Sequence, residues 1–460
     1  MSTTPKKLLS LALALMLALQ WAPALAARSS VTWNGDSADV TADDVEDIYA
    51  SSWKNYHYND QDAYMRDDGV YIWDDELQEW VLVEDPDQAL LRETHSVSVR
   101  FGPDYADLND GVSEEHLPSS IAVRAGNVSS RYSDEDTNGY RIGISAQPGI
   151  NGIPFSISAG NVDVVSPNSA LGIELMGESA TVNVSGYVHT DGTNNTRAVY
   201  AGANKDATQT VTVDGEVNAT SEKGFAQGVI AFSKEGQASV TTGSVTARGG
   251  HGGSGVSATA GSTDYDSETE TIIEHSGKTD MTVNGDVSAI GSDLAVYWVD
   301  TTGVSASSQK DSENTVTVTG SVSAVKTGNN GSAHGLNMSG GKGSTTTVTV
   351  GKDVSANASQ YQATGVSVSG NGQFTAEIGG NVTASGASSA TGMNAWATAN
   401  GGDVTLNAKD VSATATQGGA KGATIRSFDG NLSLTLGNLS AEGKTGHSQG
   451  LNIQSGRQRR

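Results

Sequence analysis

The chain of 460 residues contains no cysteine, and it has only one long apolar run. Without cysteine, disulfide bonds cannot hold the chain together, which excludes the small cysteine-rich scaffolds found among exported proteins. The apolar run covers residues 8–19, which is too short for a helix that crosses a bilayer. The sequence therefore predicts a protein that does not span a membrane, and the lack of cysteine in a large exported chain favours a bacterial source.

Basic residues are scarce relative to acidic ones, with 27 Lys and Arg against 52 Asp and Glu and a net charge of -25. The excess is concentrated in residues 31–116, which hold 23 acidic and 4 basic residues. Residues 117–460 hold 29 acidic and 20 basic residues. A surface of this sign repels phosphate backbones, so we expect no nucleic-acid partner.

The N-terminus has the pattern of an export signal. Lys6 and Lys7 precede the apolar run, and Ala24-Leu25-Ala26 follows it as an A-x-A site. This order is typical of a secretory signal peptide. We therefore predict that residues 1–27 are a signal peptide cleaved near Ala26 or Ala27, and that the protein is secreted or lies at the cell surface.

The remainder of the chain is dominated by a repeated phrase, V-T-V-x-G-x-V-x-A, which begins at Val211 and again at Val316. A second phrase, Gly followed by apolar, any and apolar residues, begins at Gly172, Gly335, Gly365 and Gly450. The third valine of the first phrase can be followed along the chain as an anchor. The anchors are Val188, Val217, Val245, Val287, Val322, Val354, Val382, Val411 and Leu439. Their spacing indicates a unit of about 28 residues with three insertions, which is typical of solenoids and other repeat architectures.

Within each unit the apolar residues alternate with polar ones, and no period of 3.6 residues is present. Alternation predicts strands, because successive side chains leave opposite faces. Each unit gives three short strands, with glycines expected at the corners where the backbone approaches closely. We therefore predict an all-β fold, a parallel β-helix with about 28 residues per turn. Right-handed crossovers are the rule for parallel strands, so we expect a right-handed coil.

In three units the alternation is one residue out of step with the anchor, at Thr242, Ala408 and Leu436. A one-residue slip turns a strand inside out unless a corner absorbs it. We expect a tighter corner in these turns.

Residues 28–116 differ in composition and contain four of the seven tryptophans. Residues 69–73 and 79–83 flank a five-residue acidic loop and predict a hairpin, while residues 42–49 favour the start of a short helix. We interpret 28–116 as an acidic, aromatic-rich head or cap, 117–455 as the β-helix repeats and 456–460 as a basic tail. Trp53, Trp73 and Trp80 are candidates for stacking on sugar rings, although a small cap also needs aromatic residues for its own core.

Residues 134–139 read D-E-D-T-N-G, the opening of a calcium loop. Asp134, Asp136 and Asn138 are therefore candidate calcium ligands, with a solvated acidic turn as the alternative. Position twelve of the pattern is Ser145, where an EF-hand needs glutamate, so the pattern excludes an EF-hand. The sequence indicates no other cofactor.

Two insertions and one repeat carry further candidates. Residues 262–280 form a polar, acidic insertion that we expect to be a loop leaving the wall. The next insertion carries Tyr297 and Trp298, which either form a contact site or fold back onto the wall. Trp396 and Phe232 fall at outward positions of the alternation, and Trp396 is a further candidate for ligand binding.

The two phrases and their period resemble those of bacterial surface β-helix proteins, of the adhesin and autotransporter-passenger kind. The resemblance covers roughly residues 120–455 and implies a rigid stalk that binds host or neighbouring cell surfaces, including their glycans. The sequence departs from autotransporters in showing no C-terminal translocating barrel. Export beyond the signal peptide, anchoring and a shortened reading frame are thereby left open.

Some β-helix proteins are polysaccharide-degrading enzymes, which need paired carboxylates or a base beside calcium. The corner residues Glu216, Asp286, Asp353 and Asp410 recur just before the anchors and predict an intermittent acidic ladder. Such a ladder is more typical of a solvated edge than of catalysis. We expect a non-enzymatic, adhesin-like or structural protein; the alternative is a polysaccharide-binding or polysaccharide-degrading β-helix.

Overall fold

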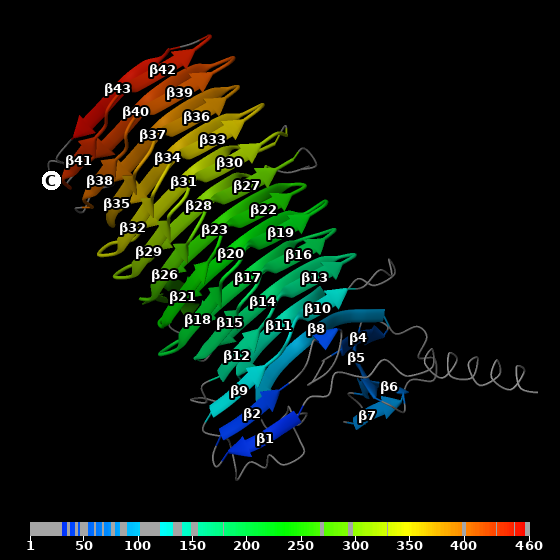
Figure 1. The fold of residues 1–460 in the computed structure, drawn as a ribbon. Coiled ribbons are helices and arrows are strands. Elements are labelled where there is room, and N and C mark those ends of the chain that lie inside the picture. The colour runs from blue at the N-terminus through cyan, green and yellow to red at the C-terminus, as the bar shows by residue number, and fades with distance from the viewer. Residues whose placement is uncertain are drawn as a thin grey trace, which may run out of the picture.

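The computed structural model is an all-β parallel solenoid with about 29 residues per turn, close to the predicted unit (Figure 1). It describes residues 30–34, 37–41, 45–46, 54–58, 61–66, 69–74, 79–82, 90–101, 120–131, 140–148, 155–177, 179–266, 271–292, 298–328, 330–397, 402–428, 430–445 and 447–455. No helix occurs in these ranges, and so none of them contains a helix that could cross a membrane.

Three long sheets form the walls, and each turn contributes one strand to each of them. Sheet A consists of β1 (Ser30–Asn34), β2 (Ser37–Thr41), β9 (Ser120–Arg124), β12 (Phe155–Ala159), β15 (Ala180–Val184), β18 (Thr208–Val213), β21 (Gln237–Thr242), β26 (Lys278–Val283), β29 (Glu313–Val318), β32 (Thr345–Val350), β35 (Gln373–Ile378), β38 (Val404–Asn407) and β41 (Leu432–Thr435). Sheet B consists of β3 (Val45–Glu46), β10 (Val128–Arg131), β13 (Val162–Ser166), β16 (Val188–Gly192), β19 (Val217–Ser221), β22 (Val245–Gly249), β27 (Val287–Gly291), β30 (Val322–Lys326), β33 (Val354–Ala358), β36 (Val382–Gly386), β39 (Val411–Ala415) and β42 (Leu439–Gly443).

Sheet C consists of β4 (Lys54–Tyr58), β5 (Gln61–Arg66), β6 (Gly69–Asp74), β7 (Glu79–Leu82), β8 (Leu90–Phe101), β11 (Tyr140–Pro148), β14 (Ser169–Gly177), β17 (Thr196–Ala203), β20 (Phe225–Ser233), β23 (Gly252–Ala260), β28 (Thr301–Ser308), β31 (Ala333–Gly340), β34 (Gln362–Gly370), β37 (Ser389–Ala397), β40 (Gly419–Ser427) and β43 (Gln449–Ser455). From β9 to β43 every strand of the three walls pairs in parallel with its copy one turn later. The first phrase supplies sheets A and B, and the second phrase supplies sheet C.

The anchors confirm the predicted register, because each one begins a strand of sheet B. Val188 pairs with Val217, and the pairing continues turn by turn to Val411 and Leu439. The valine anchors are at most 1% exposed, so they form a continuous column in the core. Insertions between turns do not shift the column, because the extra residues leave the solenoid between strands.

The tighter corner predicted for the out-of-step units is present after Thr242. Thr242 is 1% exposed and pairs with Val283 of the next turn, so its strand keeps the correct face inward. The corner after Thr242 has two residues, Gly243 and Ser244, where the next turn has three, residues 284–286. The corner after Thr242 therefore absorbs the slip. Ala408 and Leu436 lie just past the ends of β38 and β41, where the corners have three residues, and both are partly buried against the core.

The glycines of the second phrase lie inside the strands of sheet C and not at corners as expected. Gly365 is in the middle of β34, and a Cβ there would lie 2.4 Å from Val382 Cγ1 and 2.6 Å from the carbonyl oxygen of Gly392. The same contacts recur along a column that runs through Gly143, Gly172, Gly228, Gly255, Gly303, Gly335, Gly365, Gly392 and Gly422, with Ala198 in one turn. Close approach of sheet C to the anchors therefore explains these glycines.

The N-terminal strands confirm one expectation and correct another. Strands β6 and β7 pair antiparallel, as predicted for the hairpin. Residues Val45 and Glu46 form a strand, so the predicted helix is wrong there. Strands β2, β3 and β8 pair in parallel with β9, β10 and β11. The signal peptide and the basic tail lie outside the described residues, and the division into head and repeats stays a prediction.

Candidate functional site

The sequence-predicted aromatic residues do not gather into one site among the described residues. Trp73 and Trp80 lie directly opposite each other in the β6–β7 hairpin, whereas Trp298 and Trp396 contact different partners elsewhere on the solenoid. Trp53, Tyr297 and the calcium candidates Asp134, Asp136 and Asn138 lie outside the described residues. No group of three or more potential metal ligands occurs in the described part of the chain.

Trp298 folds back onto the wall and still remains 55% exposed. Its ring meets Tyr361 edge to face, with 4.8 Å between the ring centroids and an angle of 69°. Of the two alternatives left open by the sequence, folding back onto the wall is therefore realised, and a contact site at the exposed part of the ring stays a prediction.

Asp300 lies beside Trp298 and is held by several hydrogen bonds. Its Oδ1 accepts the Ser332 N–H at 2.7 Å, and His334 Nε2 lies 3.6 Å from its Oδ2. Burial raises the pKa of the Asp300 carboxyl, but hydrogen bonds from His334, the Ser332 N–H and Trp298 outweigh burial and hold that pKa below its usual value. The cluster thus combines an exposed aromatic ring with a fixed, ionised carboxylate.

Trp396 occupies an outward position in sheet C, as predicted. It is 49% exposed, and the guanidinium of Arg426 in the next turn lies 5.8 Å from its ring centroid. Phe232 lies in the same outward column, but Thr259, Ser307, Ser339 and Ser369 separate the two aromatic residues. They therefore do not form an aromatic stripe.

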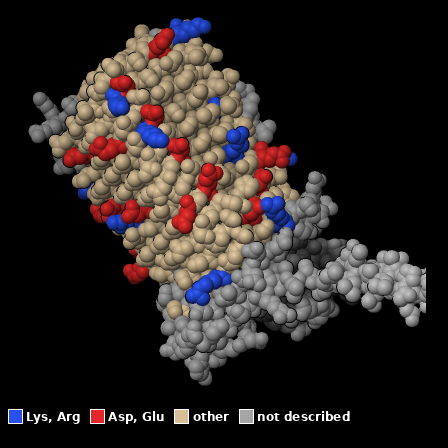
Figure 2. Space-filling model, in the orientation of Figure 1, with Lys and Arg blue, Asp and Glu red and all other residues tan. Residues whose placement is uncertain are grey.

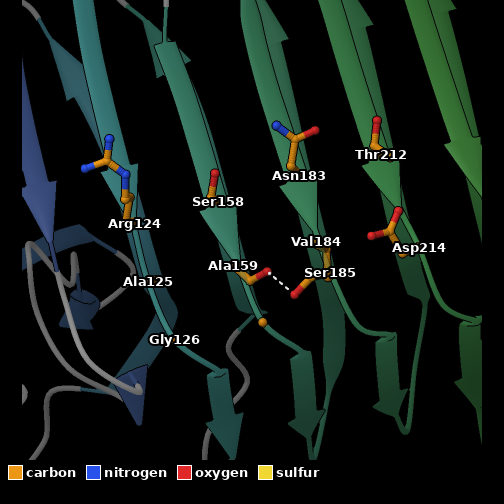
Figure 3. Close-up of a pocket in the computed structure, with 11 residues that line it drawn as sticks. Arg124, Ala125, Gly126, Ser158, Ala159, Asn183, Val184, Ser185, Thr212 and Asp214 are labelled. Atoms are coloured by element: carbon orange, nitrogen blue, oxygen red, sulfur yellow. Dashed lines mark hydrogen bonds between the residues drawn. The ribbon is translucent and has the colours of Figure 1, made fainter.

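A polar groove of about 590 Å³ runs across the first turns of sheet A (Figure 3). Successive strands contribute Arg124, Ser158, Asn183 and Thr212, one per turn in register, and Asp214 lies at the corner. The column continues beyond the groove as Thr241, Thr282, Thr317 and Thr349. Because neighbouring strands are about 4.8 Å apart, the groove offers hydrogen-bonding groups at a regular spacing.

The sequence analysis missed this groove. Its residues are ordinary polar types, and only their alignment on successive anchors places them in one column. Among the four residues that line the groove in register, Arg124 is the charged one, and Asp214 adds a carboxylate at the corner. These two charges are the signal that an alignment of the units offers.

The corner carboxylates connect the turns. Oδ1 of Asp286, Asp353 and Asp410 accepts the backbone N–H of Ser321, Asn381 and Asn438, in each case at 2.7 Å. Each acceptor lies just before an anchor, and each donor lies at the same position one turn later. Asp286, Asp353 and Asp410 are thus backbone caps, which gives these three carboxylates of the ladder a structural role.

The acidic insertion is a hairpin and not the loop that we expected. Strands β24 (Ser262–Asp266) and β25 (Thr271–His275) pair antiparallel, with Tyr265 opposite Ile272. These two side chains are 66% and 70% exposed. Both faces of a two-stranded ribbon are open to water, so its strands can carry acidic residues. The acidic composition of the segment therefore led to the wrong prediction of a loop.

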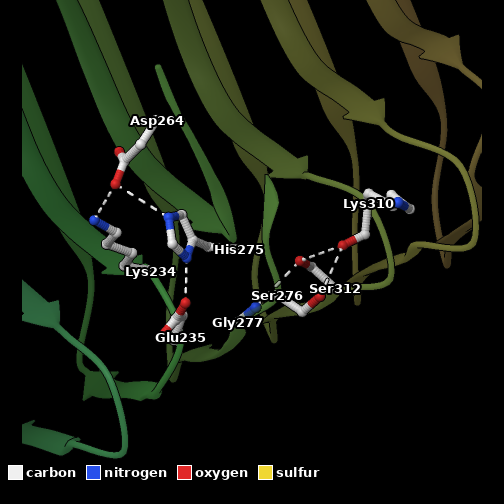
Figure 4. A network of polar contacts seen from close by, with 8 residues as sticks. All are labelled: Lys234, Glu235, Asp264, His275, Ser276, Gly277, Lys310 and Ser312. Carbon is white, nitrogen blue, oxygen red and sulfur yellow. Dashed lines mark hydrogen bonds and ion pairs between the residues drawn. The ribbon is translucent and has the colours of Figure 1, made fainter. Parts of the chain in front are cut away.

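Ionic contacts fix the base of the hairpin to the preceding turn (Figure 4). The carboxylate of Asp264 contacts Lys234 Nζ and lies 3.0 Å from His275 Nε2, while His275 Nδ1 contacts Glu235. On the other side, Lys310 Nζ donates to Glu274 at 2.7 Å. The hairpin is therefore attached to turns on both sides of the insertion.

Charged side chains are otherwise scattered. Figure 2 shows acidic and basic residues singly or in small groups among uncharged ones on the face in view. Comparison of the chain with models of known protein families, with curated proteins and with solved structures gives no match. Function is therefore inferred from the geometry of the sites alone.

Proposed function

We propose that this protein is a secreted or cell-surface rod, adhesin-like and non-enzymatic, that binds host or neighbouring cell surfaces along its walls. The observation that carries the proposal is the unbroken stacking of the three sheets from β9 to β43. With a rise of about 4.8 Å per turn, about ten turns form a rigid wall on the order of 50 Å long.

The outward side chains support binding along the wall. They include the polar groove on sheet A, Trp298 beside Asp300 and Trp396 beside Arg426. Each of these sites combines groups suited to a polar ligand with a fixed backbone, and they occur at different heights along the rod. A rod with several modest sites suits multivalent attachment, because linked sites raise the effective concentration of one another.

A polysaccharide-binding or polysaccharide-degrading protein is the second candidate. The ionised Asp300 beside the exposed Trp298 favours it, since glycosidases combine carboxylates with a surface for the sugar. A degrading enzyme needs a second carboxylate across the scissile bond, so release of product separates the two candidates.

The test is incubation of the purified mature protein with a glycan array and with intact bacterial and epithelial cells, with and without calcium. Binding to cells or glycans without release of soluble sugar is expected. A Val217→Asp variant, which buries a charge in the core, serves as the unfolded control. Calcium-dependent binding would assign a role to Asp134, Asp136 and Asn138. Depolymerised glycan in the supernatant, or no binding to any cell or glycan, would overturn the proposal.

A further inference from the structure

A second groove, of about 630 Å³, lies on the outer face of sheet B in the first turns of the solenoid. Its lining residues belong to strands β10, β13, β16 and β19, which lie side by side in Figure 1, and to the corners that join sheet A to sheet B. Its side chains are those of Arg131, Asp163, Tyr187, His189, Glu216 and Asn218. Of these residues only Glu216 stood out in the sequence, as a corner carboxylate.

Two corner glycines leave the groove hollow. Gly186 and Gly215 line it, and a Cβ on Gly215 would lie 2.7 Å from the carbonyl oxygen of Gly186. Stacking of the corners therefore requires glycine, and Tyr187 and Glu216 follow directly after these two positions. Asn161 Oδ1 accepts the Tyr187 N–H at 3.1 Å, and the Glu216 carbonyl accepts the Val188 N–H at 3.0 Å. The backbone of both residues is thus fixed.

The polar groups of the groove are fixed as well. Asp163, His189 and Asn218 stack on successive strands in one outward column. The Asp163 side chain is only 11% exposed, its Oδ2 contacts the guanidinium of Arg131, and its Oδ1 lies 3.2 Å from His189 Nδ1. The carboxylate is therefore held in place by two neighbours that reach the surface, since Arg131 and His189 are 64% and 39% exposed.

The combination of groups points to a ligand class. Tyr187 is 42% exposed and presents an aromatic surface, which suits the apolar C–H face of a sugar ring. His189, Glu216 and Asn218 surround it with planar donors and acceptors that suit neighbouring hydroxyl groups. Asp163 and Glu216 give the groove two carboxylates against one guanidinium, so an acidic sugar would be repelled.

We propose that this groove binds a neutral saccharide, with Tyr187 stacking on the ring and Glu216, His189 and Asn218 bonding its hydroxyl groups. The inference rests on the proposed surface-binding function and adds to it a ligand class and a site. The largely buried carboxylate of Asp163 positions His189 and Arg131 at the edge of the groove. The competing explanation is that the cluster only staples adjacent turns together.

The experiment compares the full mature protein with Tyr187→Ala and Glu216→Gln variants. The probes are neutral oligosaccharides of glucose, galactose, mannose and N-acetylglucosamine, with sialylated and uronate-containing oligosaccharides alongside. Tyr265→Ala, at an exposed tyrosine of the hairpin, and Glu222→Gln, at an exposed glutamate of the same turn as Glu216, are matched controls. A Tyr187→Phe variant keeps the ring, and thermal unfolding of every variant verifies the fold.

We expect the wild-type protein to bind a neutral oligosaccharide, and both groove variants to bind it about tenfold more weakly or worse, a loss of about 1.4 kcal/mol. Both controls and Tyr187→Phe should bind as wild type does, with unchanged melting temperatures. If Tyr187→Ala and Glu216→Gln bind the neutral oligosaccharide as tightly as the wild-type protein does, the inference is overturned. A preference of the wild-type protein for the acidic oligosaccharides overturns it as well. If the protein binds cells and yet no neutral saccharide, the groove assignment fails and the proposed function stands. Binding to neither cells nor saccharides rejects both.

Discussion

In several turns the residue just before the anchor position joins adjacent turns through its side chain. Asn127, Asn161, Ser244, Asp286, Asp353 and Asp410 all occupy this position, and each accepts the backbone N–H of the equivalent residue one turn later. Carboxylate oxygens accept this bond at 2.7 Å, and amide and hydroxyl oxygens accept it at 3.0–3.3 Å. Because all three kinds of oxygen can accept it, the acidic ladder is intermittent. The sequence showed the recurrence of these residues but could not show the bond, because its donor is backbone.

Replacing Asp353 tests the cap. Asp353→Ala removes the acceptor for the Asn381 N–H and should lower the free energy of unfolding by about 1 kcal/mol, the usual net value of one hydrogen bond. Asp353→Asn keeps an acceptor and should be close to neutral, since asparagine fills the same position at 127 and 161. Urea unfolding monitored by circular dichroism measures both. An equal loss in the two variants would show that charge and not capping matters.

Substitution of Gly365, in the glycine column of sheet C, should lower the free energy of unfolding more than loss of one cap does. An alanine there would meet Val382 Cγ1 and the Gly392 carbonyl oxygen at 2.4 and 2.6 Å, so the strand must shift. We expect Gly365→Ala to cost about 1–3 kcal/mol, as overpacking of a core does. Ala198 shows that the column adapts to one methyl group, so the fold should persist. Ser367→Ala, on the outward face of the same strand, should change stability by less than about 0.5 kcal/mol.

At the scale of the element, the β24–β25 hairpin shows how an insertion is accommodated. The strands on either side of it keep their register, because β21 pairs with β26 and β23 with β28 as if the insertion were absent. The hairpin is held by Lys234, Glu235 and Lys310, which belong to the neighbouring corners. An insertion can thus be long without disturbing the wall that carries it.

The ion pair between Lys234 and Asp264 at the base of the β24–β25 hairpin should make the stability of the protein depend on pH. The hydrogen bond from Lys234 lowers the pKa of the Asp264 carboxyl and outweighs desolvation, which raises it, while the charge of Lys234 and the contact with His275 add to the lowering. A lowered folded pKa means that the stabilisation is present above the unfolded pKa and is lost as the pH falls through the folded pKa. Lys234→Met should therefore raise the pKa of Asp264 towards its ordinary value.

Titration of the carboxyl ¹³C resonances by NMR measures this shift. Lys223→Met, at an exposed lysine of an earlier corner, is the control and should leave Asp264 unchanged. An Asp264 pKa that is the same in Lys234→Met and wild type would contradict the geometry of the contact.

For the whole molecule, the fold could be predicted because one pattern is repeated. The anchor valines specify the register of sheet B, and the alternation on either side specifies which residues of sheets A and C are buried. Three features could not be predicted. The glycines of sheet C are required by the distance between two walls, which the sequence does not show. The β24–β25 hairpin has little alternation of apolar and polar residues. The groove at Asp163 and His189 joins residues 26 positions apart, and their alignment can be seen only once the register is known.

Because the turns repeat, we expect that one full turn can be removed without unfolding the protein. Residues 354–381 make one full turn, so their deletion joins Asp353 to Val382, which occupies the same corner position as Val354. We expect the shortened protein to fold, with a rod shorter by about 4.8 Å in small-angle X-ray scattering. Deletion of residues 354–367, half a turn, is the matched control and should unfold the C-terminal turns. Failure of the full-turn deletion to fold would mean that the turns are not interchangeable.

The orientation of the ladders has a mechanical consequence. The strands lie across the rod, so the hydrogen bonds between turns point along its axis, and a load spread over a whole turn is borne by three ladders at once. A load applied through the chain itself meets one corner first and can peel the turns in succession. Each released turn of about 28 residues would add up to about 100 Å of chain. Under a load applied through the chain, such a protein would therefore lengthen in steps, one turn at a time, and would not break in a single event.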